Sequence, residues 1–140
     1  RLTGRTQTEQ MRLDAQREGD YRETLFALRW PRDVLYRRID LRVDQMIENG
    51  LIDEVRTLRR DEENHPTALQ AIGYKEIAAA LEGRMTMDEA VALVKQLSRN
   101  YAKKQMTWFQ RDPRCVWIDA ENRSADDIAQ TMLTYLEEHP

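Results

Sequence analysis

The chain has too few cysteines and histidines for two common kinds of site in small proteins. Its 140 residues include one cysteine, Cys115, and two histidines, His65 and His139. One thiol cannot form an internal disulfide, and these three residues have no spacing that is typical of zinc ligands. Any metal ion in the function is therefore expected to arrive with a substrate.

Long hydrophobic runs are also absent. The longest apolar stretches, TLFAL and IAAAL, are far shorter than the roughly 20 residues that cross a bilayer as a helix. The sequence does not begin with the charged-then-apolar pattern of a secretion signal. We therefore expect a cytoplasmic protein that contacts no membrane.

Positive charge is not in excess overall, but it is concentrated locally. The formal net charge of −3 argues against a protein that coats nucleic acid indiscriminately. Residues 29–42 nevertheless hold five arginines against two acids, and residues 99–111 hold four cations and no acid, whereas residues 119–140 hold six acids against one arginine. Such runs are either solvated helix faces or parts of one basic surface, and only their arrangement in space decides.

Hydrophobic spacing and local stop signals predict one α/β domain. The apolar content of 41% is enough for a real core. The predicted elements are a strand over 23–30, helices over 31–49 and 51–60, a glycine-containing turn into a helix ending at 83, a helix over 87–110, a strand over 115–120 and a helix over 125–138. Capping boxes are expected at Thr86 with Glu89 and at Ser124 with Asp127.

The two predicted strands have no further strands to pair with. Two isolated strands do not make a stable sheet, so the chain is expected to be the C-terminal part of a larger α/β protein. Residues 1–22, with a possible capping box at Thr6 and Glu9, have few large apolar side chains and are expected to form a connector. Residues 23–140 are expected to form the domain itself.

The helix over 87–110 combines apolar, basic and amide side chains near its end. Leu97, Tyr101 and Trp108 fall within about 60° of Val94 on a helical wheel, which predicts a buried face. Gln105 falls within this face. It is either a core glutamine bonded to backbone or a member of a wet cleft with Lys104 at its rim, because an unsatisfied amide costs about 1–3 kcal/mol.

Two other segments also carry residues that have both a structural and a functional interpretation. Arg38 and Arg42 lie one turn apart beside the apolar stripe of the helix over 31–49; they either extend along it into water or present two guanidinium groups to phosphate oxygens. In QAIGYK, Gly73 permits a close backbone approach at a helix start, and Tyr74 either stacks on a base or covers the core.

Three stretches in this order resemble the bacterial tRNA dimethylallyltransferases, also called tRNA isopentenyltransferases. They are YRRIDLRVDQMIENGLIDEV, QAIGYKEI and RNYAKKQMTWF, and the opening LTGRT is similar to the segment after that family's inserted tRNA-binding helices. The resemblance covers nearly the whole chain and implies the mainly helical C-terminal part of a P-loop NTPase-like core. Its two strands would belong to a parallel sheet whose other strands lie elsewhere.

The resemblance implies an enzyme that moves a dimethylallyl group from dimethylallyl diphosphate to N6 of the adenosine 3′ of the anticodon. In this family the P-loop core holds the diphosphate with Mg²⁺, and the target base leaves its stack. Arg42, with Arg38 beside it, matches the diphosphate-binding position. The implied tRNA contacts are Gln70, Ala71, Ile72, Gly73, Tyr74 and Lys75, and Lys103, Lys104, Gln105, Met106, Thr107, Trp108, Phe109 and Gln110.

The sequence departs from the family pattern in two ways. Lys104 stands where the family commonly has arginine, so a bidentate contact becomes a single-point one. No GxxxxGK[ST] motif and no following aspartate occur, so no catalytic residue is expected here and these residues are expected to be inactive alone. A full-length enzyme is expected to be a monomer that binds the tRNA anticodon stem-loop. Two alternatives stay open: a prenyltransferase that acts on adenine nucleotides, and a non-catalytic RNA-binding module.

Overall fold

The computed structural model describes Thr6 and residues 23–60 and 67–139. In chain order these form β1 (Leu25–Arg29), α2 (Arg32–Glu48), α3 (Leu51–Arg60), the 3₁₀ turn η2 (Ala68–Gln70), α4 (Tyr74–Leu81), α5 (Met87–Phe109), β2 (Cys115–Asp119) and α6 (Ala125–Glu138). The predicted elements are confirmed, with ends that differ by at most two residues. The expected connector over 1–22, including the Thr6–Glu9 capping box, lies outside the described residues apart from Thr6 itself.

Both of the capping boxes predicted in the described part are confirmed. At the start of α5, Thr86 Oγ1 accepts the Glu89 N–H at 3.2 Å while Glu89 Oε2 accepts the Thr86 N–H at 2.8 Å. At the start of α6, Ser124 and Asp127 make the same reciprocal pair at 3.1 Å each. The hydrogen bonds from the Thr86 backbone and hydroxyl lower the pKa of Glu89, and those from Ser124 lower the pKa of Asp127.

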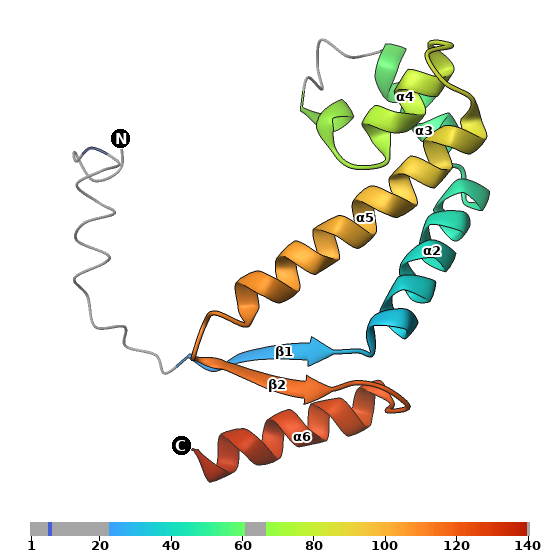
Figure 1. Ribbon diagram of the computed structural model, residues 1–140. Helices are drawn as coiled ribbons and strands as arrows, with labels where there is room; N and C mark the ends of the chain where they lie inside the picture. The colour runs from blue at the N-terminus through green and yellow to red at the C-terminus, as the bar shows by residue number, and fades with distance from the viewer. Residues whose placement is uncertain (1–5, 7–22, 61–66, 140) are drawn as a thin grey trace.

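The strands β1 and β2 pair in parallel, with Leu25 opposite Cys115 and Arg29 opposite Asp119. Helix α6 lies along one face of the two strands. There the Phe26 and Tyr135 rings pack edge to face, with their centres 5.5 Å apart. Figure 1 shows α2 and α5 running away from the other side of the strands, with α3 and α4 at their far end. The described chain is therefore elongated, with the strands and α6 at one end and the helical cluster at the other.

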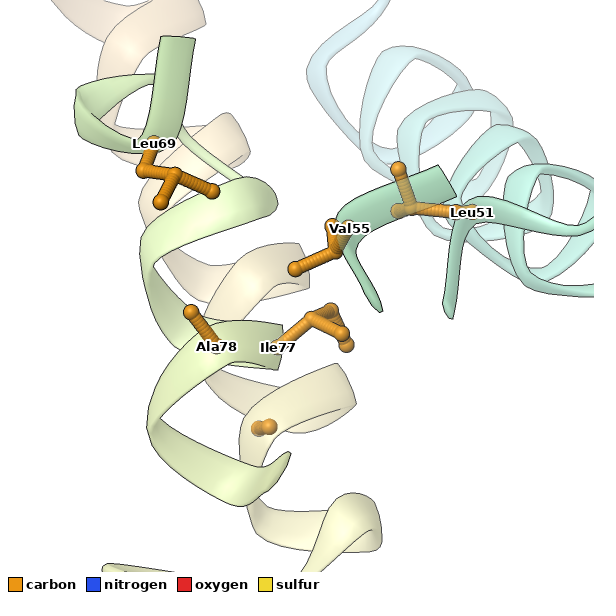
Figure 2. Close-up of a cluster of buried hydrophobic side chains, with 6 residues drawn as sticks. Leu51, Val55, Leu69, Ile77 and Ala78 are labelled. Atoms are coloured by element: carbon orange, nitrogen blue, oxygen red, sulfur yellow. The ribbon is translucent and has the colours of Figure 1, made fainter. Parts of the chain in front are cut away.

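The best-packed core lies in the helical cluster (Figure 2). Val55 of α3, Ile77 of α4 and Ala90 of α5 are each 0% exposed, and Leu51, Leu69 and Ala78 pack around them. Val94, one turn further along α5, is also buried. The first half of α5 is thus the element against which α3 and α4 are assembled.

Ion pairs join α2 to the middle of α5. Asp44 contacts Lys95 at 2.6 Å, and Asp40 pairs with Arg99. These contacts fix the two helices side by side along residues 95–99 of α5.

None of the described helices has the length and apolar character needed to cross a membrane.

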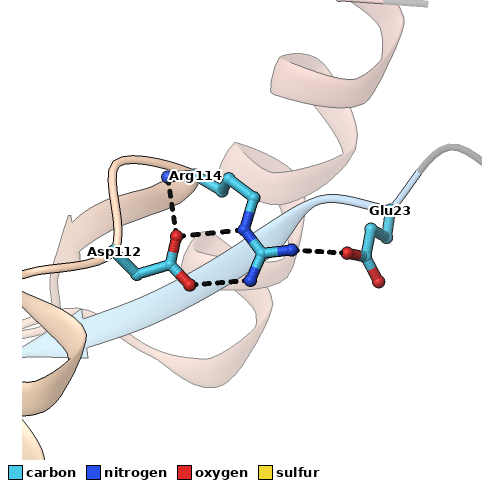
Figure 3. A network of polar contacts seen from close by, with 3 residues as sticks. All are labelled: Glu23, Asp112 and Arg114. Carbon is cyan, nitrogen blue, oxygen red and sulfur yellow. Dashed lines mark hydrogen bonds and ion pairs between the residues drawn. The ribbon is translucent and has the colours of Figure 1, made fainter. Parts of the chain in front are cut away.

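A second polar network ties the turn after α5 to the start of β1 (Figure 3). Arg114 contacts both carboxylate oxygens of Asp112, at 3.0 and 2.8 Å, and reaches Glu23 at 2.8 Å. The Arg114 backbone N–H also donates to Asp112 at 3.0 Å. These bonds lower the pKa of Asp112 to about 2.

Candidate nucleic-acid interface

The two stretches that the family resemblance links to RNA meet at one cavity. This cavity, called here the aromatic pocket, has a volume of about 640 Å³. It is lined by Ile72 from the first stretch, by Lys103, Lys104, Thr107 and Trp108 from the second, and by Leu97, Asn100, Tyr101 and Arg111. Residues about thirty positions apart in the sequence thus share one surface.

The aromatic side chains of this pocket are exposed, which corrects the sequence prediction. Tyr101 is 55% exposed and Trp108 is 65% exposed, whereas the helical wheel predicted both on a buried face. The wheel identified side chains that share a side of α5, but burial needs a neighbouring element, and α2, α3 and α4 pack elsewhere. Leu97, on the same predicted face, is half-buried, and so is Phe109.

Two carboxylates, Glu76 and Glu54, hold the loop that carries Ile72. Gly73 has φ +100°, a conformation that favours glycine, and its N–H donates to Glu76 Oε2 at 2.8 Å. Glu76 is only 7% exposed, although glutamate is mostly a surface residue. The Tyr74 hydroxyl donates to Glu54 at 2.9 Å, and this bond raises the pKa of Tyr74.

Sequence reasoning missed Glu76. The available signal was a glutamate three residues after a glycine at a helix start, which is a capping-box spacing. Tyr74 packs against the helical core, so its ring matches the core-cover alternative; contact between Tyr74 and RNA stays a prediction. The other residues of this stretch divide by exposure: Gly73 is buried, whereas Gln70, Ala71 and Lys75 are exposed beside Ile72.

The second stretch presents different residues on different sides of α5. Lys104 and Trp108 line the aromatic pocket, and the Thr107 hydroxyl donates to the Lys103 carbonyl at 3.0 Å. Gln105, Met106 and Phe109 instead line an apolar cavity of about 300 Å³ with residues that include Phe26 and Trp117. Gln110 is exposed at the helix end.

Gln105 matches neither sequence alternative fully. Its side chain lines the apolar cavity, as its place among apolar residues suggested, but the residue is exposed and no hydrogen bond of its side chain is found among the described residues. A solvent-exposed amide can bond to water, so it does not carry the cost of a buried one. Whether Gln105 contacts RNA stays a prediction.

The cations of the described chain fall into two groups. Most arginines, and Lys95, lie within ion-pair distance of a carboxylate, as in Arg29 with Asp119 at 2.7 Å. Among the described residues, those with no carboxylate within ion-pair distance are Arg32, Arg38, Arg42, Arg60, Lys75, Lys103, Lys104, Arg111 and Arg123. Arg123 donates instead to Asp127 O and to Thr131.

Every described cation that the sequence selected as a phosphate or RNA contact belongs to the group without a carboxylate partner. On α2, Arg38 and Arg42 are both exposed, and the Arg38 guanidinium lies 4.2 Å from the centre of the Trp30 ring. A cation already neutralised by a carboxylate would have to exchange partners to bind phosphate. The unpaired cations keep their full charge for an anionic ligand.

No cluster of three or more potential metal ligands occurs among residues 23–60 and 67–139. Mg²⁺ prefers carboxylate and phosphate oxygens in octahedral arrangement.

A sequence profile described as IPP transferase matches residues 1–112. The chain belongs to the IPP transferase family. Among curated relatives, it is 46% identical over 119 residues to the tRNA dimethylallyltransferase of Carboxydothermus hydrogenoformans, an alignment that covers 85% of this chain and 38% of that protein. It is 51% identical over 100 residues to tRNA dimethylallyltransferase 1 of Citrifermentans bemidjiense, covering 71% and 33% respectively.

Solved structures of IPP transferases share the fold. The full-length tRNA isopentenylpyrophosphate transferase of Bacillus halodurans aligns with a TM-score of 0.79 at 35% identity, over 93% of this chain and 43% of that one. The tRNA delta(2)-isopentenylpyrophosphate transferase of Staphylococcus epidermidis aligns at 0.80 and 31%, over 99% and 45%. This IPP transferase chain is thus a mainly helical part of a P-loop-like α/β fold, and it spans less than half the length of the relatives it matches.

Proposed function

We propose that these residues form a tRNA-binding part of a tRNA dimethylallyltransferase. A polypeptide of the relatives' full length that carries these residues, called here the full-length polypeptide, would transfer dimethylallyl from its diphosphate to N6 of the adenosine 3′ of the anticodon. The observation that carries the proposal is the aromatic pocket, where Ile72 from one predicted RNA stretch lies with Lys104 and Trp108 from the other.

The walls of the aromatic pocket suit an unpaired RNA segment. Exposed Tyr101 and Trp108 offer ring faces on which bases stack, and Lys103, Lys104 and Arg111 offer charge to phosphates without competing carboxylates. An anticodon loop supplies unpaired bases of this kind. Family membership and the names of the relatives support tRNA rather than another RNA.

The proposed reaction exchanges one bond for another. The N6 nitrogen attacks C1 of the dimethylallyl group, a nitrogen–carbon bond forms, and the C1–oxygen bond to diphosphate breaks. The bonding electron pair leaves with diphosphate, and the N6 proton passes to a base. No residue of this chain is assigned that role, so its contribution is to hold the RNA and to neutralise the leaving group.

Arg42, with Arg38, is proposed to bind the departing diphosphate. The family resemblance places this role at Arg42. Both guanidinium groups support it, because they are exposed and neither pairs with a carboxylate among the described residues. A guanidinium can hold two phosphate oxygens at once, which suits a leaving group that gains charge. Mg²⁺, which the resemblance also implies, would add positive charge at the same diphosphate, with its protein ligands outside these residues.

The proposal also includes that the full-length enzyme is a monomer and is located in the cytoplasm.

A transfer assay tests the activity. The full-length polypeptide is incubated with dimethylallyl diphosphate and an anticodon stem-loop or AMP, and product is measured by mass spectrometry. We expect a prenylated stem-loop and unmodified AMP. Prenylated AMP would instead assign the enzyme to nucleotide substrates. If the polypeptide is folded and binds RNA but transfers no dimethylallyl group, the transferase proposal is wrong and the non-catalytic RNA-binding module is supported.

The Arg42 role has a separate test. We expect Arg42→Ala in the full-length polypeptide to raise the KM for dimethylallyl diphosphate about tenfold or more, because a charge-assisted contact is worth about 1.5–3 kcal/mol. RNA affinity should change little. Arg37→Ala is the matched control, since Arg37 lies on the same helix but pairs with Asp33 at 2.9 Å. Loss of RNA affinity with an unchanged KM would refute the assignment.

A further inference from the structure

A third cavity on α5 meets the aromatic pocket at Lys103. This cavity, called here the α2 pocket, has a volume of about 200 Å³ and is lined by Trp30, Arg32, Leu35, Tyr36, Lys103 and Met106. Lys103 lines both cavities. The α2 pocket therefore meets the aromatic pocket at one lysine, and it shares Trp30, Leu35 and Met106 with the apolar cavity of about 300 Å³.

The α2 pocket has aromatic rings paired with arginines. The Arg32 guanidinium carbon lies 5.1 Å from the centre of the Tyr36 ring, and Arg32 Nε donates to the Tyr36 hydroxyl at 3.1 Å. Trp30, the other aromatic wall, carries the Arg38 guanidinium over its ring. Alternating rings and guanidinium groups of this kind form a stacking platform with positive charge.

The acids of α2 do not neutralise this platform. Three of the four pair with other cations, Asp33 with Arg37, Asp44 with Lys95 and Asp40 with Arg99, and the fourth, Glu48, is the last residue of the helix. Within the described part of the chain, Arg32 and Lys103, the two cations that line the pocket, have no carboxylate at ion-pair distance. The charge at the α2 pocket is thus available to an anionic ligand.

The size of the α2 pocket limits the ligand. Small-molecule sites usually enclose about 300–1,000 Å³, so a cavity of about 200 Å³ is too small for a whole cofactor. It suits one ring and its adjacent phosphate. The neighbouring aromatic pocket, at about 640 Å³, has room for more.

From this arrangement we propose that the RNA-binding surface continues from α5 over Lys103 onto α2, where the α2 pocket takes one unpaired nucleotide next to those in the aromatic pocket. The base stacks on Tyr36 and its phosphate contacts Arg32 and Lys103. The inference rests on the proposed function, because it extends the same RNA, and it adds Trp30, Arg32 and Tyr36 to the contact residues.

The test measures RNA affinity and its salt dependence in the full-length polypeptide. Arg32→Ala should lower affinity for an anticodon stem-loop several-fold and reduce the slope of log affinity against log salt by about 0.7–0.9, as expected for one lost phosphate contact. Tyr36→Ala should lower affinity roughly fivefold or more, whereas Tyr36→Phe, which keeps the ring, should retain most of it. Arg37→Ala is the control, and thermal melting checks that each variant is folded.

The outcomes separate the two proposals. Trp108→Ala is measured in parallel as the probe of the aromatic pocket. If it weakens RNA binding while the Arg32 and Tyr36 variants bind normally with an unchanged salt slope, the extension onto α2 is wrong and the proposed function stands. If Trp108→Ala has no effect, the proposed function fails first. A raised KM for dimethylallyl diphosphate in Arg32→Ala, with unchanged RNA affinity, would assign the α2 pocket to the diphosphate and overturn the inference.

Discussion

The two halves of α5 have the same helical pattern but opposite exposure. In the first half, Ala90 and Val94 are buried under α3 and α4, whereas in the second half Tyr101 and Trp108 are more than half exposed. The spacing of apolar residues is similar in both. The difference lies in what surrounds them, and it underlies the proposal that the apolar stripe with unpaired lysines beside it binds RNA.

The sharpest way to break this comparison is to put the same charge on each half. We expect Val94→Asp to cost more than about 4 kcal/mol of unfolding free energy, because a buried carboxylate without a partner is among the most destabilising substitutions. Asn100→Asp, on the exposed half, should change it by less than about 0.5 kcal/mol. Chemical denaturation of the full-length polypeptide measures both, and equal costs would mean that both halves are core.

Removal of an aromatic ring from the exposed half tests the opposite side of the comparison. Trp108→Ala should weaken binding of an anticodon stem-loop by about 1–3 kcal/mol, or roughly 5- to 150-fold, through lost stacking. Its effect on unfolding should be smaller, since the side chain is 65% exposed. Trp108→Phe should restore most of the affinity. Normal RNA binding by Trp108→Ala would mean that the ring packs against protein instead.

Two lysines of α5 sharpen the comparison at the level of charge. Lys104 has no carboxylate partner in the described chain, whereas Lys95 contacts Asp44 at 2.6 Å. Lys104→Ala should reduce the salt slope of RNA affinity by about 0.7–0.9, and Lys95→Ala should leave it unchanged. The same test applies to Lys103. Equal slopes in all variants would make Lys103 and Lys104 solvated surface charges.

The smallest expected effect concerns the end of the exposed half. Arg114 holds the pKa of Asp112 at about 2. Because the folded pKa lies below the unfolded value, the stabilisation is present above about pH 4 and is lost as pH falls through about 2. Arg114→Ala should return the pKa of Asp112 toward 3.8, as measured by carboxyl NMR titration. Asp119, whose pKa is lowered by Arg29, is the control and should not shift. An unmoved Asp112 would show that Arg114 does not hold it.

Local signals predicted the elements of this chain well, because they act within a few residues. Thr86 with Glu89 begins α5 as expected, and Gly50 separates α2 from α3. Burial on the second half of α5 was predicted wrongly, since it depends on neighbours that the helical period does not contain. The pairing of cations was also beyond prediction: Arg99 meets an aspartate 59 positions away. The resemblance named both Ile72 and Lys104, but only the three-dimensional structure shows that they line the same pocket.

The parallel pairing of β1 with β2 has a consequence for how the chain assembles. It joins positions 90 residues apart, and every helix from α2 to α5 lies inside the loop that it closes. Closing a long loop costs chain entropy before any contact repays it, and distant contacts form more slowly than local ones. We therefore expect the helices to associate first and the strands last, so that the aromatic pocket takes shape early and strand pairing is the slow step of folding.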